Sequence, residues 1–320
     1  MGRLLLAFAL AAVLAAVSGC KPAQVTLAVD PGFYPSAVAH DPVHDRFFVA
    51  SYATGAIAMV WRDGSIVGAV RPAGASHPIL QLAYDAIARR LWVLTPDLVE
   101  LIDPARLPVH GTVVAVRSPG GRFADLAAAG AGRAFILDGA TGAVVEVDAD
   151  RRAMRAVARL PDGTGDGALM VLPDRTALVA ARGDRLWRID LASRAVEPVA
   201  LGAPLSDVSQ LVFVASDAVA HHAAAFRGRA NEVVTLRFTP DARRAFVDLG
   251  TRMRYDTPLH GAYDGRQVVV LLGRIRHHPS FGGDGRPNLP PRLAAYAPGQ
   301  APREIRVAGT TAGEADALVR

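Results

Sequence analysis

A short apolar strand recurs along this chain at intervals of 42, 43, 44 or 48 residues, and no other feature constrains the fold as much. A period of about 40 to 45 residues is that of one four-stranded β-propeller blade. The copies are RFFVAS from Arg46, RLWVLT from Arg90, RAFILDG from Arg133, RTALVAARG from Arg175, DAVAHHAAA with Ala218 in the same slot, and RQVVVLLG from Arg266.

A second strand follows each of these copies and repeats with them. The second set is AIAMVWRDG from Ala56, LVELIDPA from Leu98, AVVEVDAD from Ala143, RLWRIDLAS from Arg185, EVVTLRFTPD from Glu232 and RLAAYAPG from Arg292. Six units predict an all-β, six-bladed β-propeller, whose radial repetition leaves only short edges. Two segments compete for the strand that closes the ring, QVTLAVD from Gln24 and REIRVAG from Arg303.

The N-terminus has the pattern of a secretory signal. Arg3 precedes an apolar run from Leu4 to Val17, which is too short for a stable membrane-spanning helix. The residues that follow, Ser18-Gly19-Cys20, complete a sequence that resembles the bacterial lipobox. That resemblance implies that Cys20 is acylated, with palmitate among the chains added, and becomes the first residue of the mature protein. Lys21 then implies sorting to the outer membrane, facing the periplasm.

These boundaries predict three parts: a lipoprotein signal peptide at residues 1–19, an anchor linker with a candidate closing strand at 20–30, and the propeller at 31–320. Cys20 is the only cysteine, so no internal disulfide is possible, and acylation would use up the only thiol nucleophile. We expect a location in the bacterial cell envelope, with the membrane as a partner through the lipid.

The net charge of +5 does not indicate a nucleic-acid partner. Lys21 is the only lysine, and the 34 arginines are spread among the turns instead of forming one tract. Phosphate binding needs a focused basic stripe. We therefore expect no nucleic acid among the partners.

The first strand of each blade begins at the rim of the central channel, where propellers build their sites. Counting back from the repeat anchors places several polar residues near this channel mouth. The candidates are Ser36, Asp125, Asp166, Asp207 and His260.

The stretch PSAVAHDPVHDRFFVAS, with GAIAMVWRDG, RFAD and GDGALMVLPD further on, resembles the SMP-30/gluconolactonase/LRE-like family of six-bladed propellers. Lactonases of that family hold a divalent cation with a Glu, two Asn and an Asp. Carried over, those places are Ser36, Ala124, Asp166 and Asp207, so two of the four ligands are absent. Asp166, Asp207 and His260 remain as a candidate metal set for one divalent cation (Ca, Mg, Mn or Zn), which would activate water against a lactone carbonyl.

Blade six carries a long insertion, from Arg274 to Pro291, which resembles the Pro-rich loop of the same family. His277 and His278 lie in it, and both can turn inward in a loop. Loops of this length in compact domains are functional or mobile. The two histidines are therefore candidates for ligand or metal contact.

Two functions follow from these features. The first is a lipid-anchored, periplasm-facing propeller that binds a small ligand or a protein partner at the channel mouth, with no certain cofactor. The second is a divergent metal-dependent lactone hydrolase. Whether the chain is an enzyme stays open at this stage, as do its catalytic residues.

Overall fold

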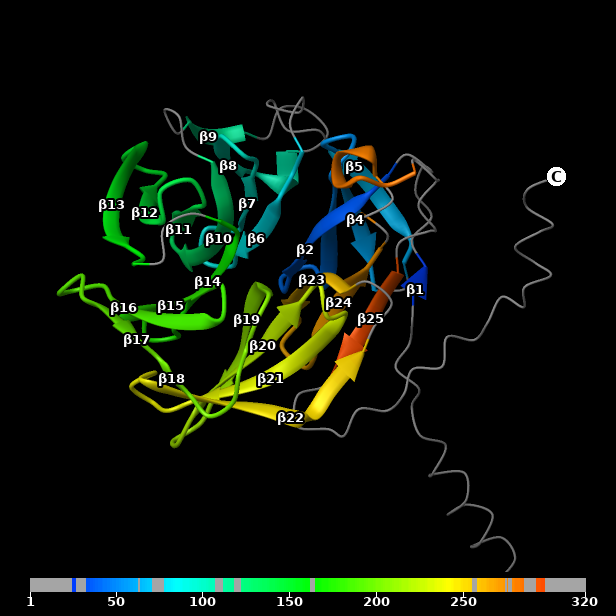
Figure 1. Ribbon diagram of the computed structural model, residues 1–320. Coiled ribbons are helices and arrows are strands. Elements are labelled where there is room, and N and C mark those ends of the chain that lie inside the picture. Colours follow the sequence, from blue (N-terminus) through cyan, green and yellow to red (C-terminus); the bar gives the residue numbers. More distant parts are fainter. Residues whose placement is uncertain are drawn as a thin grey trace, which may run out of the picture.

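The computed structural model describes residues 25–26, 33–62, 64–70, 78–106, 112–117, 122–161, 165–254, 258–273, 275, 278–284 and 292–296. Cys20, the signal segment and His277 lie outside these ranges. The described residues form six antiparallel sheets arranged around one centre, which is a six-bladed β-propeller (Figure 1).

Each sheet is one blade, and its strands run outward from the central channel in chain order, except that the N-terminal β1 (Val25–Thr26) is the outermost strand of blade six and β18 (Ala200–Leu201) that of blade five. Blade one holds β2 (Pro35–Asp41), β3 (Arg46–Ser51), β4 (Ile57–Trp61) and β5 (Ile66–Val70). Blade two holds β6 (Gln81–Asp85), β7 (Arg90–Leu94), β8 (Leu98–Ile102) and β9 (Thr112–Arg117). Blade three holds β10 (Phe123–Gly130), β11 (Arg133–Asp138), β12 (Ala143–Asp148) and β13 (Ala153–Arg159).

The other half of the ring follows the same order. Blade four holds β14 (Gly167–Val171), β15 (Ala177–Arg182), β16 (Arg185–Asp190) and β17 (Val196–Pro198). Blade five holds β19 (Val208–Ser216), β20 (His221–Arg227), β21 (Glu232–Phe238) and β22 (Arg244–Arg254), with β18 (Ala200–Leu201) parallel to β22. Blade six holds β23 (Pro258–Tyr263), β24 (Val268–Leu272), β25 (Arg292–Tyr296) and β1 (Val25–Thr26).

The repeat in the sequence therefore predicts the blades correctly. The six copies from Arg46 to Arg266 mark the second strand of each blade, and the segments from Ala56 to Arg292 mark the third. Short 3₁₀ helices also lie between strands in the described part of the chain, among them η1 (Pro104–Arg106) and η3 (Pro279–Phe281). Within the described residues, no helix is long and apolar enough to cross a membrane.

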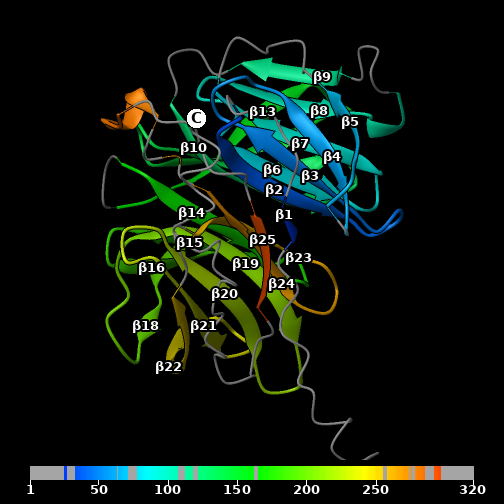
Figure 2. The ribbon, with the colours of Figure 1, turned by 90° about the vertical axis from the view of Figure 1, so that its right-hand side faces the viewer.

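The N-terminal strand completes blade six. Val25 pairs with Leu293 and Thr26 with Arg292, antiparallel to β25, and β1 lies beside β25 (Figure 2). A salt bridge adds to this closure, because Arg62 of blade one reaches Asp264 of blade six at 2.7 Å. The segment from Arg303 lies outside the described residues.

Aspartates end many of the inner strands and explain the tight turns that follow. The Asp85 carboxylate accepts hydrogen bonds from the backbone N–H groups of Ile87 and Ala88, and Asp217 does the same for Val219 and Ala220. This is the Asx-turn geometry that favours aspartate at such positions. Asp85 also accepts from the N–H of Gly132 in the next blade, so one side chain fixes a turn and a blade interface.

The hydrophobic core lies between neighbouring blades. Each cluster draws on two adjacent sheets, as where Phe226 and Val233 of blade five meet Val270 and Tyr296 of blade six. Alanine, valine and leucine fill most of these positions, and aromatic side chains are a minority. Gly261 shows how close the blades come, since a Cβ there would lie 2.1 Å from the ring of Phe226.

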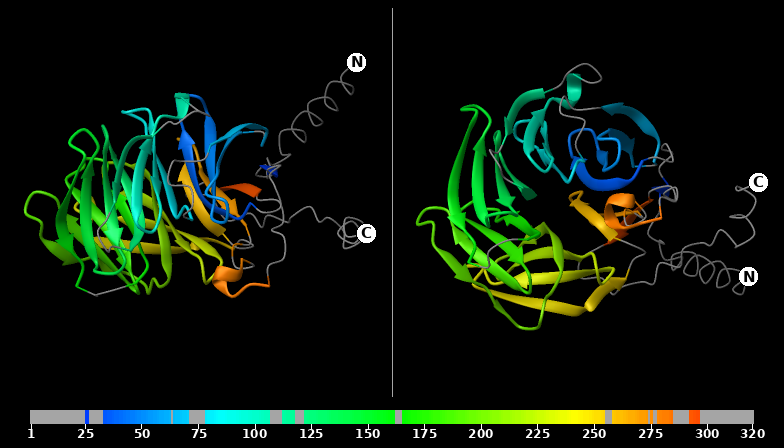
Figure 3. Two further views of the ribbon diagram at one scale, coloured as in Figure 1. Left: turned by 90° about the horizontal axis from the view of Figure 1, so that it is seen from above. Right: turned by 45° about the horizontal axis from the view of Figure 1, so that its top comes forward.

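The antiparallel order gives the ring two ends with different turns (Figure 3). At the mouth end lie the starts of the inner strands and the turns between the second and third strands. At the opposite end, here called the exit end, lie the turns between first and second strands and between third and fourth strands. The two ends carry different side chains, and each has its own pocket.

Candidate functional site

A pocket of about 680 Å³ opens at the mouth end of blades four, five and six, and we call it the mouth pocket. Its walls are the connector into β14, the β15–β16 turn, the start of β19, the β20–β21 turn and the start of β23. The insertion of blade six contributes Ile275 and Phe281. Volumes of about 300 to 1,000 Å³ are typical of small-molecule sites.

Three arginine–aspartate pairs lie at the mouth pocket, and five of their six residues line it, while Arg122 reaches Asp166 from outside the lining. Their closest N–O distances are 3.8 Å for Arg229 and Asp207, 3.8 Å for Arg122 and Asp166, and 3.9 Å for Arg185 and Asp184. All six side chains are exposed. Exposed pairs at such distances contribute little to stability, so these groups stay available to a polar ligand.

A buried arginine shapes the floor of the same pocket. The Arg182 guanidinium donates hydrogen bonds to the carbonyl oxygens of Gly139 (3.2 Å) and Gly165 (3.1 Å), and so joins blade four to blade three. Glycine is required beside it at Gly167, because a Cβ there would lie 2.6 Å from the Ala181 carbonyl oxygen. The entry to β14, and with it Asp166, is therefore held in place by backbone contacts.

The insertion of blade six packs on blade one through aromatic rings. The His278 ring lies edge-on to Tyr34 and Tyr52, with centroid distances of 4.9 Å and 5.4 Å. Phe281 contacts Tyr52 at 4.9 Å on one side and lines the mouth pocket on the other. His278 also accepts a hydrogen bond from the Ser280 N–H and so begins η3. The predicted ligand His278 is thus placed in a docking contact that holds Phe281 over the pocket.

Asp125 lies between blades, not at the open rim. It is buried in β10, where Gln81 of blade two donates to it at 2.6 Å and the Leu169 N–H of blade four donates to it at 2.6 Å. Burial raises the pKa of Asp125 to about 7, against the lowering effect of these donors. Through these two hydrogen bonds, Asp125 of blade three links blades two, three and four.

His260 and Gln210 make the same kind of link on the other side of the channel. Gln210 bonds both the N–H (2.7 Å) and the carbonyl (2.9 Å) of Gly261 in the next blade. His260 accepts the Val38 N–H on Nδ1 at 3.3 Å, while its buried Nε2 has no partner among the described residues. Burial lowers the pKa of His260 to about 3, so the ring is neutral.

The predicted metal ligands do not converge. Asp166 and Asp207 line the mouth pocket, but each faces an arginine, and His260 points into the seam between blades six and one. Ser36 is buried and donates to the Ala50 carbonyl at 3.5 Å. Within the described part of the chain, no group of three or more His, Cys, Asp or Glu side chains could hold a metal ion. These donors do not fit a resident divalent cation.

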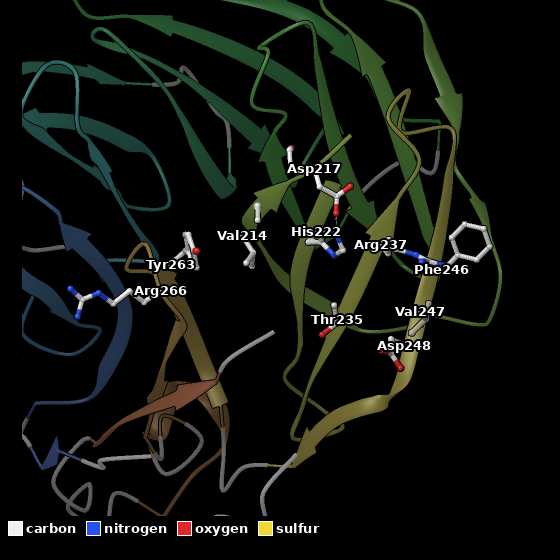
Figure 4. Close-up of a pocket in the computed structure, with 12 residues that line it drawn as sticks. Val214, Asp217, His222, Thr235, Arg237, Phe246, Val247, Asp248, Tyr263 and Arg266 are labelled. Atoms are coloured by element: carbon white, nitrogen blue, oxygen red, sulfur yellow. Dashed lines mark hydrogen bonds and ion pairs between the residues drawn. The ribbon is translucent and has the colours of Figure 1, made fainter. Parts of the chain in front are cut away.

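A second pocket, of about 750 Å³, opens at the exit end between blades five and six, and we call it the seam pocket (Figure 4). His222 and Asp217 point into it as a pair, with an N–O distance of 3.1 Å. Backbone donation from Val219, together with His222, holds the pKa of Asp217 below its usual value. Arg237 extends away from this pair toward the Phe246 ring, 5.2 Å from its centroid.

The structure thus brings two of the five channel candidates, Asp166 and Asp207, into one pocket. Sequence reasoning missed Arg185 and Arg229, because it counted only the starts of the inner strands. Both follow directly from the blade pattern, since the turn between second and third strands also lies at the mouth. Phe281 could not be found this way, because its placement depends on contacts with another blade.

No family model matches the sequence, and no curated protein matches it. Solved structures match through the fold. The allergen Mala s 1 of Malassezia sympodialis has a TM-score of 0.66 at 15% identity, over 86% of this chain and 96% of that one. A streptogramin B lyase (TM-score 0.58, 10% identity, 85% and 97% covered) and virginiamycin B lyase from Staphylococcus aureus (0.56, 10%, 86% and 99%) are also similar. At these identities the likeness extends to the propeller fold alone.

Proposed function

We propose that this chain is a lipid-anchored propeller that binds a small, polar ligand in the mouth pocket. The observation that carries the proposal is the convergence of two exposed arginines and three exposed aspartates with the apolar side chains of Leu259, Ile275 and Phe281 around one volume of suitable size. Such a site offers donors, acceptors and an apolar wall together. A ligand with both charged and apolar parts fits it best.

The cellular location of the protein is proposed from its sequence. The lipobox-like Ser18-Gly19-Cys20 supports acylation of Cys20 and a place in the bacterial cell envelope, with Lys21 supporting the outer membrane. A propeller held there by its N-terminus would face the periplasm with a soluble ligand within reach.

Binding is favoured over metal-dependent lactone hydrolysis. Hydrolysis of that kind needs oxygen ligands around one cation, and the carboxylates of Asp166 and Asp207 are each directed to an arginine. Two structural neighbours are named lyases, but their likeness to this chain lies in the fold.

Ligand-observed NMR with a collection of small carboxylic acids, amino acids and sugars tests the proposal. We expect binders whose signals are lost in the double variant Arg185→Ala/Arg229→Ala. The matched control Arg237→Ala/Arg266→Ala removes two exposed arginines at the other end of the ring and should keep the signals. The proposal would be overturned if no compound bound. It would also be overturned if the binding signals persisted in the Arg185→Ala/Arg229→Ala variant and were lost in the Arg237→Ala/Arg266→Ala control.

A further inference from the structure

The exposed apolar side chains of this propeller gather at the exit end. Among the described residues, six of the eight large exposed hydrophobic side chains lie there, in or next to the exit turns: Val43, Trp61, Ile66, Ile87, Val219 and Phe246. Leu249 lies within β22, and Phe281 lies at the mouth. Large apolar groups placed together on one face mark an interaction surface.

These six side chains occupy one arc of the ring. They belong to blades five, one and two, and blade six lies between blades five and one. Val43, Ile87 and Val219 stand two residues after the aspartate that fixes each turn, so the Asx turns themselves present these side chains to solvent. The exit turns of blades three and four carry small, polar and charged residues instead, such as Ala131, Asp150 and Ser193.

Arginines lie among the apolar groups. Arg89, Arg237 and Arg266 are exposed at the exit end, and none of them has a carboxylate within ion-pair distance among the described residues. At the mouth, by contrast, each exposed arginine named above faces an aspartate. Aliphatic, indole and guanidinium groups on one face match the interface of an anionic bilayer.

The N-terminal strand lies beside the mouth half of β25, and its first residue faces the exit. In β25 the chain runs from Arg292 at the mouth toward Tyr296 at the exit, and Val25 pairs antiparallel with Leu293, so three residue steps of β25, about 10 Å, separate the level of Val25 from the exit end. Only five residue steps separate Cys20 from Val25, which span at most about 18 Å. This reach exceeds the distance from the level of Val25 to the exit end of β25, so a lipid on Cys20 can enter a membrane that lies against the exit end of blade six.

We propose that the exit end of blades five, six, one and two lies on the bilayer surface, which leaves the mouth pocket open to the aqueous side. The inference rests on the proposed lipid anchor for the presence of a membrane and on the exit-end arc for the orientation and the contact surface. Apolar side chains and arginines at the bilayer surface would add to the attachment that the lipid on Cys20 provides.

Trp61 provides the test. It is 42% exposed within the arc, while the other two tryptophans, Trp92 and Trp187, are only 1% and 6% exposed. The protein beginning at Cys20 retains every described residue and can be coupled through its only thiol to a maleimide lipid in vesicles of phosphatidylethanolamine and phosphatidylglycerol. Brominated acyl chains in these vesicles then quench an indole that enters the interface.

We expect brominated lipid to remove up to about a third of the total emission, since Trp61 is one of three tryptophans and the interface favours indole rings. Trp61→Phe should abolish this quenching. The triple variant Val43→Asp/Ile87→Asp/Val219→Asp should abolish it too, and the matched variant Ala131→Asp/Ala192→Asp/Ala195→Asp, at the exit turns of blades three and four, should not.

Coupling through maleimide does not depend on acylation in the cell, so the two proposals fail separately. Mass spectrometry of Cys20 in protein isolated from bacterial membranes tests the lipid anchor alone. Trp61 emission that is equal in brominated and ordinary vesicles would overturn the orientation. Quenching that persists in the Val43, Ile87 and Val219 variant would overturn the role of the arc.

Discussion

The buried Asp125 and His260 should make the stability of this propeller depend on pH in opposite directions. The folded-state pKa of Asp125 is about 7, above its usual 3.8. Between these values the folded state holds a proton that the unfolded state has released, so stability falls as the pH rises. A difference of this size corresponds to about 4 kcal/mol at 1.36 kcal/mol per pKa unit.

For His260 the sign reverses. Its folded-state pKa is about 3, below the usual 6.5, so the unfolded state takes up a proton that the folded state does not. Stability is then lost as the pH falls from about 6.5 to about 3, by about 5 kcal/mol. Between about pH 4 and pH 6.5 the two contributions offset each other in the unaltered protein.

Two variants separate these contributions. Asp125→Asn removes the first titration, and His260→Asn removes the second while its amide oxygen can still accept from the Val38 N–H. Urea unfolding between about pH 4 and pH 7 gives the free energy of unfolding of each protein. The stability of Asp125→Asn relative to the parent should rise by up to about 4 kcal/mol with increasing pH, and that of His260→Asn should rise with decreasing pH.

Each prediction concerns how the difference in the free energy of unfolding between variant and parent changes with pH. A loss of stability that is the same at every pH therefore does not affect it. Other titrating groups are the same in all three proteins and cancel in the differences. Differences that stay flat within about 1 kcal/mol across this range would contradict this prediction, because they would show that neither group is held in its neutral form by burial.

Three further predictions concern packing, a blade-to-blade hydrogen bond and metal. Gly261→Ala should lower the free energy of unfolding by about 1 to 3 kcal/mol in urea, because its Cβ would collide with Phe226; an unchanged midpoint would contradict this. Tyr296→Phe should cost about 1 to 3 kcal/mol by orphaning the buried Thr235 hydroxyl, and adding Thr235→Val should recover part of the loss; no recovery would count against the bond. Calcium or zinc should leave the melting temperature unchanged. A rise in melting temperature that disappears in Asp207→Asn would instead show that Asp207 binds a metal ion.

The sequence predicts the blades well because the blade is a local unit. Each of the copies from Arg46 to Arg266 carries its own strand pattern and its own turn residues, so the count of six needs no long-range information. The closing strand was ambiguous for the opposite reason, since β1 pairs with a strand more than 260 residues away. Only the register of Val25 with Leu293 decides it.

The candidate site could be predicted only in part. Asp166 and Asp207 lie at the mouth because position along the inner strand fixes height in the channel. Asp125 and His260 occupy similar positions, but their side chains turn toward the neighbouring blade and bond its backbone. Strand position alone does not distinguish a residue that faces the opening from one that faces the next blade.

A crystal structure of the protein soaked with an NMR-identified binder shows whether the mouth pocket is the ligand site. Ligand density is expected between Arg185, Arg229 and Phe281, at the mouth end of blades four to six. Density found instead in the seam pocket, between Phe246 and Tyr263, with none at the mouth, would contradict this expectation.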